Sequence, residues 1–322
     1  MIAFLFPGQG SQQVGMGKAL TDAFPEARAT FDEADAAFGA GSVGTDSVQP
    51  ASLTTLCFDG PEDQLRLTEY TQPAILTVSI AAARVLASRG FQPDFVAGHS
   101  LGEYSANVVA GTFAFSDAVA VVRRRGRYMQ EAVPVGQGAM AAILGLDATA
   151  VRLACEDAAQ GEVVAPANIN SHDQVVIAGA AAAVERAGVL AKERGAKRVM
   201  PLPVSAPFHC ALMQPAEERL APELLSLAVQ DPGVPVVANV DAQLKRDGGA
   251  AIDALIRQVS SPVRWEEIVE RLASEGVTTY VEVGVGRVLS GLVRKTRRDA
   301  KALAFGAPED LSAVEQALGS LA

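Results

Sequence analysis

The most constraining feature of this sequence is the pentapeptide Gly98–Gly102 (GHSLG), which directly follows the apolar run Phe95–Ala97. A short buried strand, a serine between glycines and a following helix describe a nucleophile elbow, a tight turn that lifts the serine hydroxyl out of a sheet. Side chains at positions 98 and 102 would crowd this turn and the helix behind it. The alternative for an isolated pentapeptide of this kind is a serine that caps a helix after a strand.

Apolar periodicity on both sides of the elbow predicts alternating strands and helices, and therefore an α/β fold with a parallel sheet. Only 5% of the residues are aromatic, and the wealth of alanine and valine fits buried parallel strands. The expected helix at Pro73–Ser88 has its proline in the first turn. The other expected elements are a helix at Pro25–Phe38 and strands at Ile2–Phe6, Val234–Val240 and Thr279–Val283.

The pattern changes between about Gly138 and Val204, where it predicts β-α-β-β-α-β, the ferredoxin-like arrangement. Such a unit is small enough to be an inserted domain. We expect it over residues 131–201, with the large domain formed by 1–130 and 202–322. In order, the elements expected within it are Ala139–Leu144, Ala148–Ala159, Val163–Ile169, Gln174–Ala178, Ala181–Arg194 and Arg198–Val204.

The bulk properties of the chain exclude several classes of function. A net charge of −10 argues against a general nucleic-acid binder, which needs a basic face. No apolar run is long enough to span a bilayer, and the run Ile2–Phe6 ends too early for a signal peptide, so we expect a cytoplasmic protein without a membrane partner. Three widely separated cysteines form no metal-binding spacing, and we expect no metal site. A glycine- and serine-rich surface connection is expected over Gly39–Ser52.

A serine nucleophile needs a base, and the chain has only three histidines. His99 neighbours the serine, so its side chain should leave the elbow in another direction, and His172 lies in a predicted hairpin turn. His209 follows a strand end, where α/β sheets place their ligands, although a packed or capping histidine is the alternative. No acid stands out between Ser100 and His209 to complete a triad, so either an unremarkable acid or another group orients the base.

Arg125 is the third informative residue. The helix that starts near Ser116 has apolar residues at positions 118, 121 and 122, and position 125 continues this stripe. Of the run Arg123–Arg125, we expect only Arg125 on the inward face. A buried guanidinium needs an anionic partner, which is either an internal carboxylate or the carboxylate of a substrate.

Taken together, these fragments resemble the malonyl-CoA:acyl-carrier-protein transacylase family over nearly the whole chain. The resemblance rests on several short sequence motifs, here called blocks, that occur in the same order along this chain as in the family. Together they are more specific than any one of them. These blocks are Phe6–Gln12, Gly98–Ala106, Arg125–Gly126 with Tyr128–Gln130, Gly138–Ala142, Asn168–Asn170, Gln174–Gly179, Leu202–Ser205, His209–Met213, Asn239–Asp241 and Gln258 ahead of Pro262–Val263.

The resemblance implies a hydrolase-like α/β domain with a ferredoxin-like insertion. It implies transfer of a malonyl group from malonyl-CoA to the phosphopantetheine thiol of acyl carrier protein through an acyl-serine, with no permanently bound cofactor and no nucleic-acid partner. The implied roles are nucleophile for Ser100, base for His209, clamp of the malonyl carboxylate for Arg125, oxyanion hole for the backbone N–H groups of Gln9 and Leu101, and orientation of the histidine by the backbone carbonyl of Gln258.

Phe208 departs from the family pattern, because many fatty-acid members have serine there, whereas related polyketide acyltransferases with phenylalanine select malonyl groups. A trans-acting acyltransferase of a polyketide synthase is therefore an alternative. A serine thioesterase or other hydrolase and a catalytically silent carrier-binding domain are further alternatives. Two basic clusters are candidate docking surfaces or simply solvated helix faces: the first is Lys192, Arg194, Lys197 and Arg198, and the second is Arg287, Arg294, Lys295, Arg297 and Arg298.

Overall fold

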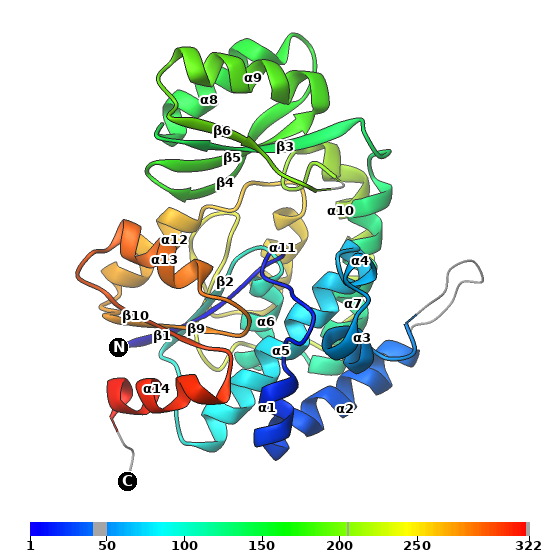
Figure 1. Ribbon diagram of the computed structural model, residues 1–322, viewed down its shortest axis with the longest axis vertical. Coiled ribbons are helices and arrows are strands. Elements are labelled where there is room, and N and C mark those ends of the chain that lie inside the picture. The colour runs from blue at the N-terminus through cyan, green and yellow to red at the C-terminus, as the bar shows by residue number, and fades with distance from the viewer. Residues whose placement is uncertain (41–49, 205, 320–322) are drawn as a thin grey trace.

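The computed structural model describes residues 1–40, 50–204 and 206–319, and contains two sheets (Figure 1). Most of the expected connection over 39–52, and residue 205, lie outside the described residues. The α/β class predicted from the sequence is confirmed. No helix in the described ranges is both long and apolar enough to cross a membrane.

The larger sheet has six strands in the order β10-β9-β1-β2-β7-β8. Neighbouring strands are parallel except for β7 and β8, which are antiparallel. Its strands are β1 (Ile2–Phe6), β2 (Phe95–Gly98), β7 (Val236–Val237), β8 (Leu244–Lys245), β9 (Thr279–Val283) and β10 (Lys301–Phe305). Strand β7 is shorter than the predicted Val234–Val240, because the backbone N–H of Asn239 donates to the side chain of Glu103 instead of to a strand.

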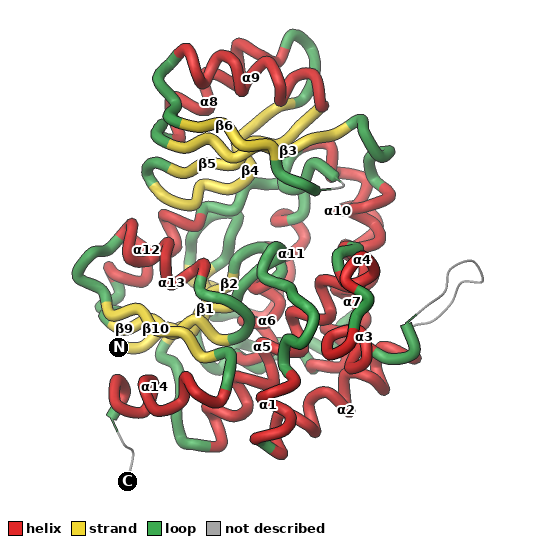
Figure 2. Tube along the Cα trace, viewed as in Figure 1, coloured by secondary structure: helices red, strands yellow, loops and turns green. Residues whose placement is uncertain are grey.

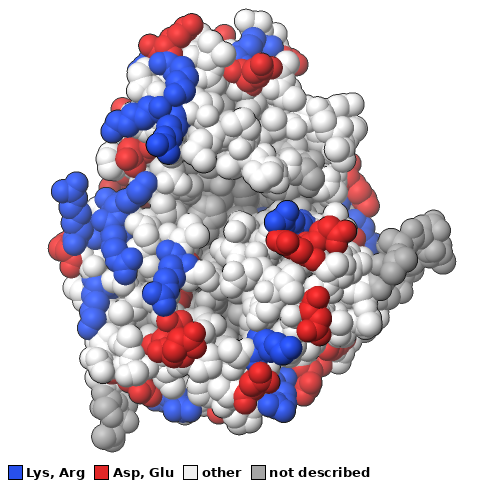
Figure 3. Space-filling view, in the orientation of Figure 1, with Lys and Arg blue, Asp and Glu red and all other residues white. Residues whose placement is uncertain are grey.

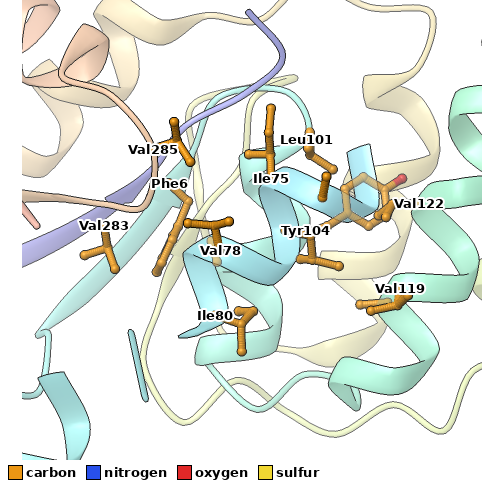
Figure 4. Packing of buried hydrophobic residues seen from close by; sticks show 14 of the residues in the cluster. Phe6, Ile75, Val78, Ile80, Leu101, Tyr104, Val119, Val122, Val283 and Val285 are labelled. Atoms are coloured by element: carbon orange, nitrogen blue, oxygen red, sulfur yellow. The ribbon is translucent and has the colours of Figure 1, made fainter. Parts of the chain in front are cut away.

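Helices cover both faces of this sheet, as the alternating side chains of its strands require. Phe4 and Phe6 point to the face covered by α2, α5, α6 and α7, whereas Ala3 and Leu5 point to the face covered by α12 and α13. These helices are α2 (Pro25–Ala40), α5 (Thr68–Ser88), α6 (Gly102–Val109), α7 (Phe115–Glu131), α12 (Trp265–Ser274) and α13 (Val288–Thr296). Figure 4 shows the first of these faces, where Tyr104 and Leu101 of the α6 segment pack towards Ile75 and Val122.

The remaining helices lie around this core. They are α1 (Lys18–Ala23), α3 (Leu53–Asp59), α4 (Glu62–Leu65), α10 (Gln214–Leu225), α11 (Gly248–Gln258), α14 (Leu311–Leu318) and the short 3-10 turns η1 (Ala211–Met213) and η2 (Pro308–Asp310). The expectation that Pro73 lies in the first turn of its helix was wrong. Helix α5 begins at Thr68 and contains Pro73 in its interior, where the missing N–H cannot donate to the carbonyl of Glu69.

The smaller sheet is antiparallel, in the order β4-β5-β3-β6, and α8 and α9 cover its outer face (Figure 2). The predicted β-α-β-β-α-β order is confirmed by β3 (Gly138–Leu144), α8 (Ala148–Ala159), β4 (Val164–Ser171), β5 (Gln174–Ala180), α9 (Ala181–Glu193) and β6 (Arg198–Pro201). Strand β4 also holds this sheet to the rest of the protein, because Ile169 donates to the carbonyl of Val263 at 2.8 Å and Val263 donates to the carbonyl of Ala167 at 2.8 Å.

Candidate active site

Ser100 lies in the tight turn between β2 and α6, with a left-handed backbone φ of 52°. The two glycines of the motif are required by close packing. A Cβ on Gly98 would lie 1.9 Å from the carbonyl carbon of Gly102, and a Cβ on Gly102 would lie 2.0 Å from the carbonyl oxygen of Phe6. Ser100 is half-buried, so this turn presents its side chain at the edge of the sheet and not inside the core.

The Ser100 hydroxyl forms a hydrogen bond with His209, and the Oγ–Nε2 distance is 2.7 Å. The other ring nitrogen, Nδ1, lies 3.0 Å from the backbone carbonyl oxygen of Gln258, the last residue of α11. A carbonyl only accepts, so Nδ1 carries the proton and Nε2 is free to accept from the serine. No carboxylate of the described residues bonds to His209, which leaves the helix-terminal carbonyl as the group that orients the ring.

His209 is almost fully buried, and its backbone also adopts a left-handed φ, of 61°. Burial, and after it the nearby positive charge of Arg125, lower the pKa of the imidazole to about 3. The ring is therefore neutral at physiological pH, which is the protonation state that a general base needs.

Arg125 lies beside this pair, at the centre of α7, and is 1% exposed. Its Nη1 donates to Oε1 of Gln72 at 2.8 Å, while Nη2 donates to Oε1 of Gln258 at 2.9 Å and to Oγ of Ser100 at 3.2 Å. In the part of the chain that the structure describes, no carboxylate lies within ion-pair distance of this guanidinium. Two neutral amides thus hold a cation against the serine, and its positive charge is not cancelled by direct contact.

The expectation that Arg125 alone of its run faces inward was wrong. Arg123 is also buried: its Nε donates to Glu69 at 3.0 Å, its Nη1 donates to the carbonyl of Phe38 at 3.1 Å, and its guanidinium lies over the Phe38 ring. Helix α7 packs against α2 as well as α5, so it has a second covered side that the apolar stripe did not reveal.

Gln9 and Leu101 lie on the two loops that follow the adjacent strands β1 and β2. These loops are in close contact, since a Cβ on Gly8 would lie 2.5 Å from the carbonyl oxygen of His99. Among the described residues, neither the backbone N–H of Gln9 nor that of Leu101 donates to another protein group. Both N–H groups thus lie on the loops beside the elbow and have no partner among the described residues.

The side chains of Asn239 and Glu103 form hydrogen bonds that hold the backbone of the elbow in place. Neither side chain was assigned a role from the sequence. Asn239 accepts from the backbone N–H of Ser100 at 2.7 Å and donates to the carbonyl of Gly98 at 2.7 Å. Glu103 accepts through Oε2 from the backbone N–H of Asn239 at 3.0 Å and from Nε2 of Gln258 at 2.6 Å. Burial raises the pKa of Glu103 to about 7, against the opposing effect of these two hydrogen bonds.

The two other histidines lie where the sequence placed them. The His99 ring turns away from Ser100, and its Nε2 lies 2.9 Å from Oδ1 of Asn170 on β4, so it links the elbow to the smaller sheet. His172 lies in the turn between β4 and β5. The described residues contain no group of three or more histidine, cysteine, aspartate or glutamate side chains that could hold a metal ion.

Comparison with known proteins gives a consistent result. The family described as the acyl transferase domain matches residues 3–313. The chain is 48% identical to the malonyl CoA-acyl carrier protein transacylase of Bacillus subtilis (strain 168), over 98% of this chain and 97% of that protein. It is 50% identical to the protein of the same name from Escherichia coli (strain K12), over 97% of each chain.

Solved structures with the same fold have similar sequences. An acyl carrier protein S-malonyltransferase from Vibrio cholerae superimposes with a TM-score of 0.92 at 49% identity, and the match covers 97% of this chain and 99% of that chain. A malonyl-transacylase solved in complex with a type II polyketide-synthase acyl-carrier protein gives a TM-score of 0.93 at 45% identity, over 98% of this chain and 99% of that chain.

Proposed function

This chain belongs to the acyl transferase family, and from that premise we propose that its serine–histidine–arginine site transfers a malonyl group from malonyl-CoA to the phosphopantetheine thiol of acyl carrier protein. Relatives named malonyl CoA-acyl carrier protein transacylase match over nearly their full length, which supports this reaction, and fatty-acid synthesis is the pathway that we propose for it. The observation that carries the assignment is the contact of a buried arginine with the nucleophile: Nη2 of Arg125 lies 3.2 Å from Oγ of Ser100.

In the first half-reaction, His209 takes the proton of the Ser100 hydroxyl through Nε2, and Oγ attacks the thioester carbonyl of malonyl-CoA. The negative charge of the tetrahedral intermediate falls on the former carbonyl oxygen, where the unpartnered N–H groups of Gln9 and Leu101 are the proposed donors. The carbon–sulfur bond breaks, and the proton on His209 passes to the departing thiolate of coenzyme A.

In the second half-reaction, His209 takes the proton of the phosphopantetheine thiol, and the thiolate attacks the malonyl-serine ester. Collapse of the second intermediate breaks the ester bond and returns the proton to Ser100. The carbonyl of Gln258 keeps the imidazole in one tautomer through both halves, because it accepts from Nδ1 at 3.0 Å.

Arg125 is the proposed clamp for the distal carboxylate of the malonyl group. Its amide partners Gln72 and Gln258 fix the guanidinium without cancelling its charge. A malonyl carboxylate supplies the missing counter-charge, whereas an acetyl group leaves the cation buried and unpaired. The same cation disfavours a simple hydrolase, which needs no charged group at this place.

We further propose that the smaller sheet marks the inserted domain, over residues 131–201, and that 1–130 and 202–322 form the large domain. All four strands of the smaller sheet lie within 138–201, which supports these boundaries. The cytoplasmic location expected from the sequence stays a prediction.

We propose the two basic clusters together as the docking surface for the carrier protein and call them the basic strip, because they are linked across the smaller sheet. Arg198 of β6 pairs with Leu144 of β3, and Leu144 pairs with Gln174 of β5, which accepts from Nζ of Lys295 at 3.0 Å. Figure 3 shows lysine and arginine side chains along the left side of the view, over α12, α13 and the smaller sheet. Several of these cations pair with local carboxylates, but Lys197, Arg198 and Arg298 form no ion pair within the described ranges.

A polyketide carrier is the second candidate acceptor, because one structural relative was solved with a type II polyketide-synthase acyl-carrier protein. Phe208, directly before the proposed base, is nearly buried and adds the sequence argument for this alternative.

The test is intact mass spectrometry of the protein after mixing with malonyl-CoA, followed by addition of holo acyl carrier protein. We expect a malonyl adduct that disappears in Ser100→Ala and that moves to the carrier's thiol. Release of free malonate without carrier malonylation would instead establish a hydrolase. Parallel reactions with a fatty-acid carrier and a type II polyketide carrier decide between the two acceptors.

A further inference from the structure

The side-chain amide of Gln258 forms hydrogen bonds with three groups: two accept from its Nε2, and one donates to its Oε1. Its Nε2 donates to Oε2 of Glu103 at 2.6 Å and to the backbone carbonyl of Ser100 at 3.0 Å. Its Oε1 accepts from Nη2 of Arg125 at 2.9 Å. The amide is fully buried, so no solvent is available to satisfy either end in another orientation.

Glu103, together with the Ser100 carbonyl and Arg125, sets which end of the amide faces which neighbour. Above its pKa of about 7 the carboxylate of Glu103 is ionised, so it accepts hydrogen bonds and cannot donate, whereas a guanidinium donates and cannot accept. A reversed amide would place NH2 against the guanidinium of Arg125 and oxygen against the carboxylate of Glu103. Both contacts would then be repulsive, so the pair of charged groups fixes a single orientation of Gln258.

The carboxylate is itself held in place. Glu103 lies in the first turn of α6, is 1% exposed, and accepts through the same Oε2 from the backbone N–H of Asn239 at 3.0 Å. Its hydrogen-bonded link to Arg125 runs through the amide of Gln258, and no ion pair joins the two residues. The negative charge therefore lies near the guanidinium without occupying the directions in which a substrate carboxylate would bind.

We propose that Glu103 is a positioning residue for acyl selectivity: by fixing the Gln258 amide with Oε1 towards Arg125, it aims the guanidinium at the distal carboxylate of the acyl group. It acts on the clamp through Gln258, and its carboxylate forms no hydrogen bond with Oγ of Ser100 or with the ring of His209. This inference rests on the proposed function, because it concerns the same arginine and the same substrate carboxylate.

The substitution E103Q tests the inference when activity is measured at about pH 8, where the Glu103 carboxylate is ionised, because it keeps the volume of the side chain and removes its charge and acceptor-only character. We expect the ratio of kcat/KM for malonyl-CoA to kcat/KM for acetyl-CoA to fall about tenfold, the effect of losing one hydrogen bond to a charged group. In an Arg125→Ala background, E103Q should leave this ratio unchanged, because the group on which Glu103 acts is then absent.

Glu282 is the matched control. It is also a fully buried glutamate, but it accepts from the backbone N–H groups of Leu289 and Ser290 at the start of α13. We expect E282Q to lower the melting temperature and to leave the malonyl-to-acetyl ratio unchanged. If E103Q does not purify as a folded protein, E103D is measured in the same way, because it keeps the charge and withdraws the carboxylate by one methylene.

Equal losses with both acyl groups, an unchanged ratio, or a loss that persists in the Arg125→Ala background would each overturn the positioning role. These outcomes differ from failure of the proposed function, in which the unmodified protein itself forms no malonyl-serine adduct.

Discussion

Arg125 donates directly to the proposed nucleophile: its Nη2 lies 3.2 Å from Oγ of Ser100, while the guanidinium also donates to the amides of Gln72 and Gln258 and lies over the Tyr104 ring. Because the guanidinium lies so close to Oγ of Ser100, a carboxylate bound to it would be separated from the serine by only the length of a short acyl group. The length and the charge of the malonyl group both match this arrangement.

Replacement of Arg125 by alanine should therefore separate the two acyl donors. We expect kcat/KM for malonyl-CoA to fall by about a hundredfold or more, as when one partner of a buried charge pair is removed, and kcat/KM for acetyl-CoA to fall much less. Arg219→Ala is the control, because Arg219 is half-exposed and pairs with Glu131 at the surface. Equal losses for both donors would exclude the clamp.

The low pKa of His209 predicts an unusual pH profile. Because burial and Arg125 lower this pKa to about 3, the imidazole stays in its basic form well below its ordinary titration range. Serine acylation by acetyl-CoA, which avoids the titratable malonyl carboxylate, should then be constant from about pH 8 down to about pH 5. Stopped-flow release of coenzyme A measures it, and an acid limb with a midpoint near the ordinary histidine value would contradict the expectation.

The close packing at Gly98 predicts a severe effect of one added methyl group. A Cβ there would lie 1.9 Å from the carbonyl carbon of Gly102, so Gly98→Ala forces the backbone of the elbow apart. We expect the free energy of unfolding in urea to fall by about 3 kcal/mol or more. Gly291→Ala, in α13 and with no atom within 4 Å of its added Cβ, should be neutral or stabilising. Similar effects of the two substitutions would show that the elbow tolerates expansion.

The basic strip predicts a charge-dependent affinity for the carrier protein. The double substitution R198E/R298E reverses two exposed cations that have no ion pair within the described residues. We expect KM for acyl carrier protein to rise several-fold at low ionic strength and the difference to shrink at high salt. Arg246→Glu, an exposed position outside the strip, serves as the control. An unchanged KM for the double variant would place docking on another surface.

Sequence reasoning found the parts of this site that local rules determine. The elbow at Ser100 follows from a strand, two glycines and a helix within a few residues, and Arg125 follows from helical periodicity. His209 emerged because the chain offers so few histidines. These residues lie together in the structure, with Ser100 in contact with both of the others.

The supporting groups could not be found in this way, because their partners are remote in sequence. Asn239 and Gln258 reach Ser100 across 139 and 158 residues, respectively, and nothing in their local sequence marks these contacts. Glu103 lies in a helix that also contains the polar residues Ser105 and Asn107, and its contacts with Asn239 and Gln258 come from two segments that meet it only in the fold. The sequence also failed to reveal that α7 is buried on a second side, at Arg123, and that α5 begins at Thr68 and not at Pro73. Both features depend on tertiary packing.

The carbonyl that holds His209 belongs to the main chain, and this has a genetic consequence. In a triad with an acidic third member, one codon change deletes the acceptor and disables the base. Here every sense codon at position 258 still encodes a peptide carbonyl, so a missense change cannot delete the acceptor itself, although it removes the amide that bonds to Arg125 and Glu103. The hydrogen bond from Nδ1 of His209 is lost only if the backbone at the end of α11 moves. The tautomer of the proposed base therefore does not depend on the presence of one acidic side chain.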